Sequence, residues 1–471
     1  MDSLTNIKFY GGVDEIGGNR ILVEDKDTKI FLDFGMSFSK HAVFFEEYLK
    51  PRYSCAGMKD LLELKLLHYM DGVYREDLLC LIGKEPHREP CIDEVLLSHI
   101  HQDHSAYVSL LDERIPISCS EISRSYAKAT LEAGRRSLET EVYNFKKRPL
   151  VNRRCDATPR IFHVRETEKP FNIDSIEVRP FAVDHSVPGA MAFIIHTFDK
   201  TLAYTGDLRL HGVRGNLTQK FVDAAANEDV DVMLCEGTRI DEEGSGSEKL
   251  VAVGAHKVIS KCEHLVGADF AYKDLDRFMT FYDLAKKNGR KIVISKRHAY
   301  LLEELQKVPE LEKSIPRIND ENILIYIDRK DTGRFVESDY DEWERGFLEM
   351  DNAVKADWIH ENQAEALVCL SFWDMNELID IAPSPGSIYV HSTSEPHNEE
   401  QVIDEQRLNN WISFFSLRKH HFHCSGHAGG KEIREMIQTI KPKELIPIHT
   451  QHPELFEKIH KNVKKPKLEG F

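Results

Sequence analysis

Three histidines and one aspartate stand within six residues of this chain, in the order His99, His101, Asp103 and His104. They directly follow Glu94-Val-Leu-Leu-Ser98, whose composition predicts a strand. At an extended strand end, residues 99 and 101 point the same way, so two imidazoles can face one metal ion while Asp103 and His104 turn toward a second. Zinc accepts this mixture of imidazole nitrogen and carboxylate oxygen. The cluster therefore predicts a metal site at a strand end rather than a solvated histidine-rich turn.

Further candidate ligands stand at the ends of other predicted strands. His185 follows the strand that begins at Ser175, Asp207 follows the strand that begins at Thr201, and His449 ends a short strand near the end of the chain. A single residue of this kind is weak support for a metal site. Together, and in this order after the cluster, these residues have the content of a two-metal site. Asp33 and Glu236 also end predicted strands.

The pattern of predicted elements divides the chain. Its 471 residues are too many for one ordinary core, so two domains are expected. The first half is rich in strands, helices and strands alternate between residues 274 and 394, and an amphipathic helix and a short strand follow at 432–441 and 444–449. We predict a first domain over residues 1–237, an inserted α/β domain over 238–405, and the end of the first domain over 406–471. Residues 36–90 read as a helical insertion.

Composition limits the other classes. No apolar run approaches the ~18 residues that span a bilayer, and the start of the chain lacks the pattern of a signal peptide, so we expect a cytoplasmic protein without membrane contact. The nine cysteines form no CxxC pair and are expected to be mostly small core residues. The net charge of −17 counts against a surface that coats nucleic acid broadly, but it leaves room for a local basic groove. The basic clusters that could line such a groove are Arg135–Arg136, 146–148, Arg153–Arg154, 286–291 and 464–467.

The candidate residues resemble the motifs of a known superfamily. The successive motifs of the metallo-β-lactamase superfamily are matched by Asp33, the His99–His104 cluster, His185 and Asp207. The motifs of its β-CASP nuclease group are matched by Glu236 in Cys-Glu-Gly-Thr, His427 in Ser-Gly-His-Ala, and His449 in Pro-Ile-His. The run Gly11-Gly-Val-Asp-Glu-Ile-Gly-Gly-Asn19 is most similar to the ribonuclease J family, where an insertion such as 36–90 is not expected.

This resemblance implies a fold and a reaction. The fold would be a four-layer αββα sandwich with an inserted α/β β-CASP domain. The enzyme would hydrolyse RNA phosphodiester bonds with two Zn²⁺ ions per chain, or Mn²⁺ in their place, and a hydroxide shared by both ions as nucleophile. One ion would be held by His99, His101, His185 and Asp207, and the other by Asp103, His104, Asp207 and His449. Asp33 and Glu236 would orient ligand histidines, although Asp33 could instead cap a turn.

The resemblance also implies a substrate site. The loop His423-Cys424-Ser425-Gly426-His427 would hold the nucleotide beside the cut, with His427 near the scissile phosphate, unless it is only a tight turn. Ser392 and Ser394 would add phosphate contacts. The expected activity is a 5′-to-3′ exoribonuclease on RNA with a 5′-monophosphate, with or without internal cleavage, and a homodimer is compatible with it. The alternatives are a DNA nuclease of the same fold, a metallohydrolase of small substrates, and a non-catalytic scaffold that binds RNA.

Overall fold

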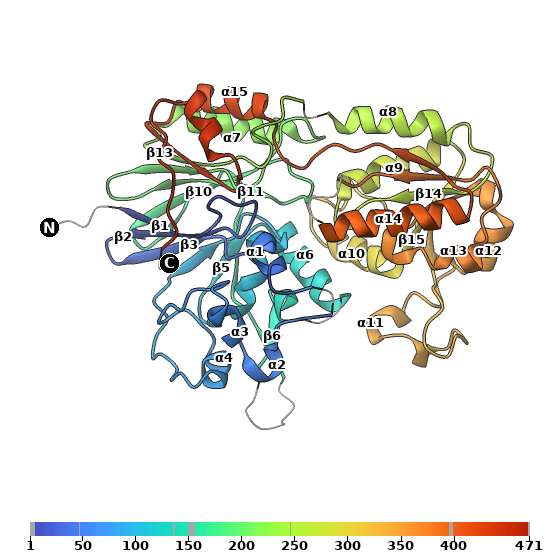
Figure 1. Cartoon of the computed structure of the whole chain (residues 1–471), viewed down its shortest axis with the longest axis horizontal. Coiled ribbons are helices and arrows are strands. Elements are labelled where there is room, and N and C mark those ends of the chain that lie inside the picture. Colours follow the sequence, from blue (N-terminus) through green and yellow to red (C-terminus); the bar gives the residue numbers. More distant parts are fainter. Residues whose placement is uncertain are drawn as a thin grey trace. The chain divides into compact units, whose positions relative to one another are not determined.

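The computed structural model of the chain describes residues 5–46, 48–134, 137–148, 156–244, 246–394 and 399–469. The chain divides into two compact units. Unit 1 consists of residues 1–245 and 426–471, and unit 2 of residues 246–425 (Figure 1). Unit 2 extends beyond the predicted limit at residue 405, because the last strand of its sheet lies at Arg418–His421.

Unit 1 contains two six-stranded sheets. The first has the order β1 (Asn6–Gly11), β2 (Arg20–Asp25), β3 (Thr28–Leu32), β4 (Glu94–Leu96), β5 (Ile117–Cys119) and β8 (Phe162–Val164). The second has the order β21 (Glu444–Ile448), β13 (Val232–Glu236), β12 (Thr201–Tyr204), β11 (Met191–His196), β10 (Ile176–Ala182) and β9 (Phe171–Ile173). A separate ribbon pairs β6 (Asn144–Lys146) with β7 (Ala157–Pro159).

The core of unit 1 lies between the two sheets. Ile21, Val23 and Ile30 of the first sheet pack with Phe193 and Leu202 of the second, and all five are fully buried. These residues alternate along their strands with side chains on the opposite face, as expected where one face of a sheet is packed. Burial of each such side chain stabilises the unit by roughly 1.5–3 kcal/mol.

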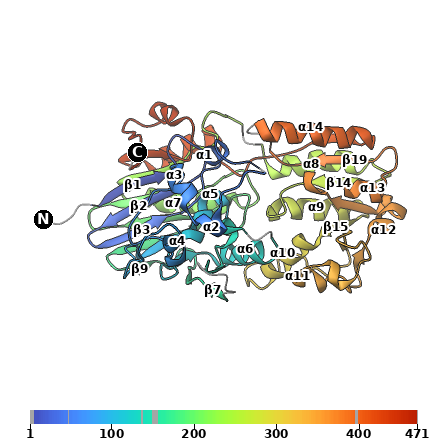
Figure 2. The ribbon, with the colours of Figure 1, turned by 60° about the horizontal axis from the view of Figure 1, so that its bottom comes forward.

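Helices cover the other face of the second sheet. The helices α7 (Gly215–Asn227) and α15 (Gly430–Ile440) contribute Phe221, Ile433 and Ile437 to a second buried cluster with Ala192 and Met233 of the sheet. The helix α6 (Glu121–Glu132) lies beside β8 of the first sheet. The unit is therefore the predicted αββα sandwich (Figure 2).

The insertion at residues 36–90 is helical in short pieces only. Its helices are α1 (Phe38–Ala42), α2 (Tyr53–Ala56), α3 (Lys59–Glu63) and α4 (Glu76–Leu81). The helix α3 ends at Glu63, because Lys65 adopts a left-handed φ of 57° that an α-helix does not allow. The buried Arg75 attaches this segment to the core, since its guanidinium donates to the carbonyl of Ser109 and pairs with Asp77 and Glu141.

Unit 2 is built on one seven-stranded sheet in which every described pair of strands is parallel. Its order is β17 (Ala353–Val354), β16 (Ile323–Tyr326), β15 (Lys291–Ser295), β18 (Ala366–Cys369), β14 (Val266–Asp269), β19 (Ile388–His391) and β20 (Arg418–His421). Parallel strands need crossover connections. The helix α8 (Glu248–Ile259) precedes the first of these strands in the chain, and the crossovers contain α9 (Leu275–Lys287), α10 (Lys296–Gln306), α11 (Glu342–Arg345), α12 (Ala356–Glu361), α13 (Glu377–Ile381) and α14 (Glu399–Phe414).

The helices of unit 2 enclose its core. Ile359, Leu378 and Leu408, from α12, α13 and α14, pack on Val368 and Tyr389 of the sheet. The alternation of helix and strand predicted from residue 274 onward is confirmed. Within the described part of the chain, none of the helices combines the length and the apolar character needed to cross a bilayer.

The described cysteines differ in exposure. Of the eight described cysteines, all free, four are buried, while Cys55 and Cys91 are exposed. The expectation that most cysteines lie in the core is therefore wrong for half of them.

The polar stretch at 241–248 leads into a helix, since Ser247 caps α8 by accepting a hydrogen bond from the backbone of Leu250.

Candidate metal centre

The predicted ligands of unit 1 follow strands that end at the same edge. The strands β12, β13 and β21 are parallel neighbours, so Asp207, Glu236 and His449 come after strand ends that lie side by side. The strand β10 is antiparallel to β11, which is antiparallel to β12, so the residues after β10, including His185, reach this edge as well. In the other sheet β3 and β4 are parallel, and His99 follows β4.

Three histidine rings form a first group. His101 Nδ1 lies 3.0 Å from His99 Nε2 and 3.1 Å from His185 Nε2. The other nitrogens of two of these rings are fixed by neighbours. His185 Nδ1 donates to the carbonyl of Gly426 at 2.6 Å, and His99 Nδ1 lies 3.1 Å from Ser98 Oγ. Nε2 of His99 and Nε2 of His185 therefore face His101 Nδ1, and neutral imidazole nitrogens of this kind can donate a lone pair to a cation.

Two aspartates and two histidines form a second group. Asp207 Oδ2 lies 3.1 Å from His104 Nε2 and 3.6 Å from His449 Nε2. Asp103 Oδ2 lies 3.2 Å from His449 Nε2. The same Asp207 oxygen lies 3.7 Å from His99 Nε2, so it stands between the two groups.

The arrangement fits divalent cations. Within each group one possible ligand atom of each residue lies within 4.8 Å of the others. Among the described residues, no hydrogen bond reaches Asp207 Oδ1, and the buried His104 Nε2 contacts Asp207 Oδ2 as an ion pair. A buried polar atom without a hydrogen bond costs free energy unless another group, such as a cation, contacts it. Imidazole and carboxylate donors in this ratio suit Zn²⁺ and also Mn²⁺. Glu236 and His427 form a third set of this kind with Asp207 and His449.

The environment sets the protonation of these groups. Burial lowers the pKa of His99 and of His185, and neighbouring imidazoles lower it further, which favours the neutral form that can bind a metal. His104 differs. Burial opposes its charge, but Asp207, Asp33 and Asp103 raise its pKa.

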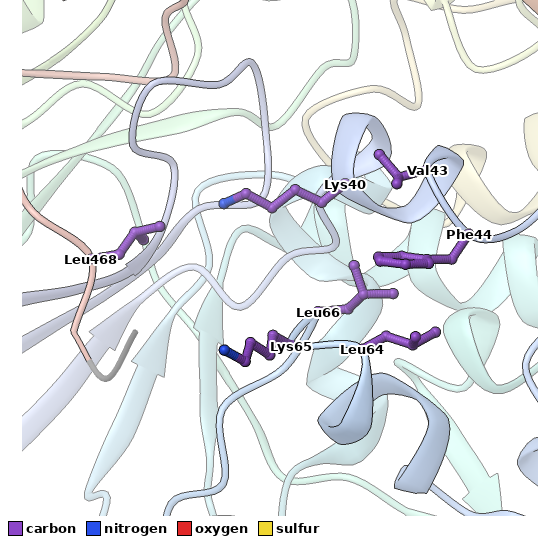
Figure 3. Close-up of a pocket in the computed structure, with 7 residues that line it drawn as sticks. All are labelled: Lys40, Val43, Phe44, Leu64, Lys65, Leu66 and Leu468. Atoms are coloured by element: carbon purple, nitrogen blue, oxygen red, sulfur yellow. The ribbon is translucent and has the colours of Figure 1, made fainter.

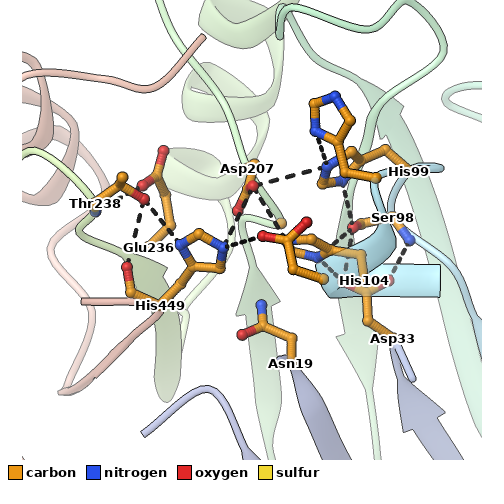
Figure 4. A network of polar contacts seen from close by, with 12 residues as sticks. Asn19, Asp33, Ser98, His99, His104, Asp207, Glu236, Thr238 and His449 are labelled. Atoms are coloured by element: carbon orange, nitrogen blue, oxygen red, sulfur yellow. Dashed lines mark hydrogen bonds and ion pairs between the residues drawn. The ribbon is translucent and has the colours of Figure 1, made fainter. Parts of the chain in front are cut away.

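Asp33 holds His104 through a buried network (Figure 4). Its Oδ2 accepts hydrogen bonds from His104 Nδ1 at 2.7 Å, from Tyr204 Oη at 2.6 Å and from Ser98 Oγ at 2.7 Å. Tyr204 Oη in turn accepts from Asn19 Nδ2 at 3.1 Å. Asp33 thus contacts Nδ1 of a histidine in the predicted ligand set, and Nε2 of that ring faces the second group. Sequence analysis missed Tyr204, because it is the last residue of a mostly buried strand and its sequence context gives no sign of a polar contact.

Glu236 contacts His427, which is outside the predicted set of metal ligands. Its Oε1 lies 3.3 Å from Nδ1 of His427, and its Oε2 accepts from the backbone of Thr238 at 3.0 Å. The imidazole of His449 is instead oriented by Thr238, whose Oγ1 lies 2.8 Å from Nδ1. The expectation that Glu236 orients a histidine of the ligand set is therefore wrong, because the turn after β13 brings the hydroxyl of Thr238 to His449. Burial opposes the charge of His427, but Glu236 and Asp207 raise its pKa to about 9.

Close backbone packing supports the histidine cluster. A Cβ added to Gly35 would lie 1.7 Å from the carbonyl oxygen of Asp103, so only glycine fits there. Gly17 has a φ of 79°, and a Cβ added to it would lie 2.6 Å from the Cβ of Asp103. The backbone of Asn19 also donates to the carbonyl of Asp103 at 3.1 Å. The glycine-rich segment between β1 and β2 therefore fixes the loop that carries Asp103.

The predicted substrate loop is divided between the two units. Gly426 and His427 belong to unit 1, and a Cβ on Gly426 would lie 2.9 Å from Ser186 Oγ. His423, Cys424 and Ser425 belong to unit 2. Burial lowers the pKa of His423 to about 4, and Arg277 lowers it as well.

A buried arginine organises this part of unit 2. Arg277 donates to the carbonyl of Ser392 at 2.6 Å and to the carbonyl of Cys424 at 3.4 Å, and it forms an ion pair with Glu248. The hydroxyl of Ser392 accepts a hydrogen bond from Arg277 and donates one to the carbonyl of Phe422. Ser392 was expected to contact a phosphate, but in the structure its hydroxyl holds the loop. The thiol of Cys424 is likewise buried, 3.2 Å from Glu248. Ser394 is exposed.

The basic clusters have mixed environments. Arg135, Arg136, Arg153 and Arg154 lie outside the described residues. Arg148 pairs with Glu141 and Lys147 with Glu113. Arg290 is buried and donates to backbone carbonyls of unit 2. Three of these basic side chains are thus engaged in the fold.

A cavity of about 380 Å³ lies apart from the predicted ligands (Figure 3). Its lining is mostly apolar and comes from the 36–90 insertion and the end of the chain, with Lys40, Val43, Phe44, Leu64, Lys65, Leu66 and Leu468. None of the predicted site residues lines it.

One family model and several known proteins are similar to this chain. Residues 415–462 match the family model RMMBL, described as the Zn-dependent metallo-hydrolase RNA specificity domain. Ribonuclease J of Sinorhizobium meliloti is 24% identical over 374 residues, which cover 77% of this chain and 59% of that protein. Ribonuclease J 1 of Streptococcus pyogenes is 24% identical over 467 residues, which cover 96% of this chain and 69% of that protein. The chain thus spans between 59% and 69% of the length of these two relatives.

A solved structure with the same fold is among the matches. It is a crystal structure of a protein of unknown function from Enterococcus faecalis V583, with a TM-score of 0.72 and 21% sequence identity. The match covers 99% of this chain and 98% of that one.

Proposed function

We propose that this chain, a ribonuclease J-like member of the metallo-β-lactamase and β-CASP group, is a divalent-metal-dependent hydrolase of RNA phosphodiester bonds. One observation carries the proposal. Seven side chains from strand ends far apart in the sequence converge into two adjacent ligand groups, in a chain whose residues 415–462 match an RNA specificity domain. A scaffold that only binds RNA would have no need for two complete groups.

The ligand assignment follows the two groups. We assign one ion to His99, His101 and His185, and a second to Asp103, His104 and His449, with Asp207 between them as a shared ligand. Two Zn²⁺ ions per chain suit these donors, and Mn²⁺ is a second candidate. When bound, such ions lower the pKa of water toward ~7 and neutralise charge that builds up on a reacting phosphate.

The side chains around the ligands have positioning roles. Asp33, Thr238 and the carbonyl of Gly426 hold the Nδ1 atoms of His104, His449 and His185, so that each Nε2 faces inward. Such partners fix the tautomer and the direction of a ligating ring before the ion arrives.

His427 is our candidate proton donor. Its Nδ1 faces Glu236 at 3.3 Å, and this carboxylate favours the charged imidazolium form. We assign it the transfer of a proton to the 3′ oxygen that leaves when the phosphodiester bond breaks. The hydrogen bond to Glu236 keeps the ring in the required orientation.

The finer properties of the substrate belong to the same proposal. We propose RNA with a 5′-monophosphate, 5′-to-3′ exonucleolytic removal of nucleotides with internal cleavage as a second mode, a cytoplasmic site of action and a homodimer. The choice of RNA over DNA is supported by the RNA specificity match, which includes His449.

A time course on matched substrates tests this function. The full chain is incubated with Zn²⁺ or Mn²⁺ and a single-stranded RNA that carries a 5′-monophosphate, beside the same RNA with a 5′-hydroxyl and the matched DNA. Release of mononucleotides from the phosphorylated RNA is the expected result, and internal fragments would assign an endonuclease instead. Equal cleavage of DNA would contradict the choice of RNA, and no cleavage of either would contradict the function.

Replacing Tyr204 by phenylalanine is expected to weaken metal binding while the fold is kept. The substitution removes the donor at 2.6 Å from Asp33 and thereby loosens the orientation of His104. Loss of such an indirect partner lowers metal affinity by about 10-fold to 100-fold. Competition with a chromophoric chelator measures the affinity directly, without reference to activity.

The matched control is Tyr389→Phe. Tyr389 is equally buried, but its hydroxyl donates to the carbonyl of Leu370 in unit 2. Its loss should lower stability by about 1 kcal/mol and leave metal affinity unchanged. Equal metal affinities for the Tyr204→Phe variant and the parent protein would disprove the positioning role.

A further inference from the structure

Three loops of unit 2 meet at one edge of its sheet. The strands β15, β18 and β14 are adjacent and parallel, so the residues that follow them lie at the same carboxyl edge. Arg297 lies in the first turn of α10 after β15, Trp373 follows β18, and Tyr272 and Lys273 follow β14. Ligands of open parallel sheets bind outside this edge, near strands where the chain reverses its direction of travel across the sheet. Here β18 returns to the gap between β15 and β14 after the chain has reached β17.

Two cations gather around one aromatic ring at this edge. Lys273 Nζ lies 5.9 Å and Arg297 Cζ lies 5.8 Å from the centre of the Tyr272 ring. Burial lowers the pKa of Lys273 to about 8, and the nearby charge of Arg297 lowers it as well. The charge of Arg297 also acts on Asp374, the neighbour of Trp373, so the three loops are close enough to interact electrostatically. Two cationic side chains thus lie on these loops together with the carboxyl group of Asp374, in a chain with a net charge of −17.

Trp373 presents its indole ring to solvent. It is 70% exposed, whereas tryptophan is buried to a high degree in most folded proteins. The ring of Phe372 contacts it edge-on, with centroids 5.0 Å apart and an angle of 66° between the planes. This contact supports the indole from the side and leaves ring surface available. An exposed aromatic ring beside cations has the chemistry that binds single-stranded nucleic acids, where bases stack on the ring and cations contact phosphates.

We propose that Trp373 stacks on an unpaired base of single-stranded RNA, and that Arg297 and Lys273 contact the adjoining phosphates. This subsite deepens the proposed function and rests on it. Single-stranded RNA is favoured over a duplex because paired bases do not offer a face to an indole ring. It is favoured over a protein partner because the two cations match a polyanion.

Equilibrium binding of a fluorescent 12-nucleotide single-stranded RNA tests the subsite. All proteins carry Asp103→Ala and His104→Ala so that the RNA stays intact, and the full chain is used throughout. Trp373→Ala is expected to weaken binding by about tenfold, since the stacking of one base on an aromatic ring is lost. Trp373→Phe should recover most of the affinity. Arg297→Gln should reduce the slope of log K against log salt concentration by about 0.7, the value for one lost phosphate contact on a single strand.

Phe414→Ala is the matched control. Phe414 is 81% exposed and packs edge-on against Phe415 with centroids 5.1 Å apart, so it has the same kind of environment as Trp373 without the cations described above. Its loss should leave RNA affinity unchanged. The four tryptophans all lie in unit 2, so their fluorescence also shows whether each variant keeps this unit folded.

The outcomes separate the two proposals. If the protein with intact Trp373 does not bind RNA, the proposed function fails. If it binds RNA and Trp373→Ala binds equally well, only the stacking subsite fails. If Trp373→Ala weakens the binding of duplex RNA as much as that of single strands, stacking on an unpaired base is excluded.

Discussion

Replacing Asp103 and His104 together by alanine is expected to lower the rate of RNA hydrolysis at least about 1,000-fold. The double substitution removes two of the four donors of the second ligand group and leaves Asp207 and His449. Loss of an ion that neutralises charge on the reacting phosphate costs several kcal/mol, and about 4 kcal/mol corresponds to this factor. The metal content, measured on the purified protein by mass spectrometry, should fall by one ion per chain.

A second histidine near the end of the chain provides the control. His452 lies three residues from His449, and its side chain is 43% exposed. His452→Ala should keep both the ion content and the rate of the parent protein. Full activity of the Asp103→Ala, His104→Ala variant would exclude the ligand assignment. Unchanged metal content with lost activity would show that these residues act on the substrate rather than on the ion.

Arg277→Ala should lower the free energy of unfolding more than any other substitution considered. The side chain is fully buried, and its loss leaves the carboxylate of Glu248 buried without its ion-pair partner. Breaking such a pair from one side destabilises a protein by about 3–5 kcal/mol. The carbonyls of Ser392 and Cys424 lose a donor in addition. Denaturant unfolding of unit 2, followed by tryptophan fluorescence, measures the free energy.

An exposed arginine of the same unit serves as the comparison. Arg407 is 59% exposed and pairs with Asp404 one turn away on α14. Arg407→Ala should change the free energy of unfolding by less than about 0.5 kcal/mol, because exposed pairs contribute little. If Arg277→Ala and Arg407→Ala lower stability equally, Arg277 does not organise the loop that contains Cys424.

The two predicted effects are distinct, since one is the loss of a metal ion and the other is the loss of stability of unit 2. Asp103 and His104 act through their own donor atoms, so their loss should leave the tryptophan-detected unfolding of unit 2 unchanged. Arg277 contacts no residue of the ligand groups and acts on the backbone of unit 2. Measuring metal content and unfolding on both variants therefore separates loss of an ion from loss of a folded unit.

The sequence by itself determined the chemistry of the ligand groups. His99, His101, Asp103 and His104 are close in the sequence, and their spacing after a strand already directs them to one place. Strands that end in a carboxylate or an imidazole, such as those before Asp207 and His449, could also be recognised, because apolar β-branched runs and turn residues are local signals. The strands of the first half and the alternating helices and strands of unit 2 followed from the same local patterns, whereas the αββα sandwich was expected from the resemblance to the metallo-β-lactamase superfamily.

Only the tertiary structure decided which neighbour holds which ring. Tyr204 reaches Asp33 because β12 and β3 face each other across the core, and the two residues are separated by 171 positions. Thr238 rather than Glu236 holds His449, because the turn after β13 places the hydroxyl there. The hydroxyl of Ser392 is engaged by Arg277 from another helix, so a serine that looked available to a phosphate supports a loop instead. Contacts of this kind depend on packing between distant segments, and no local pattern in the sequence encodes them.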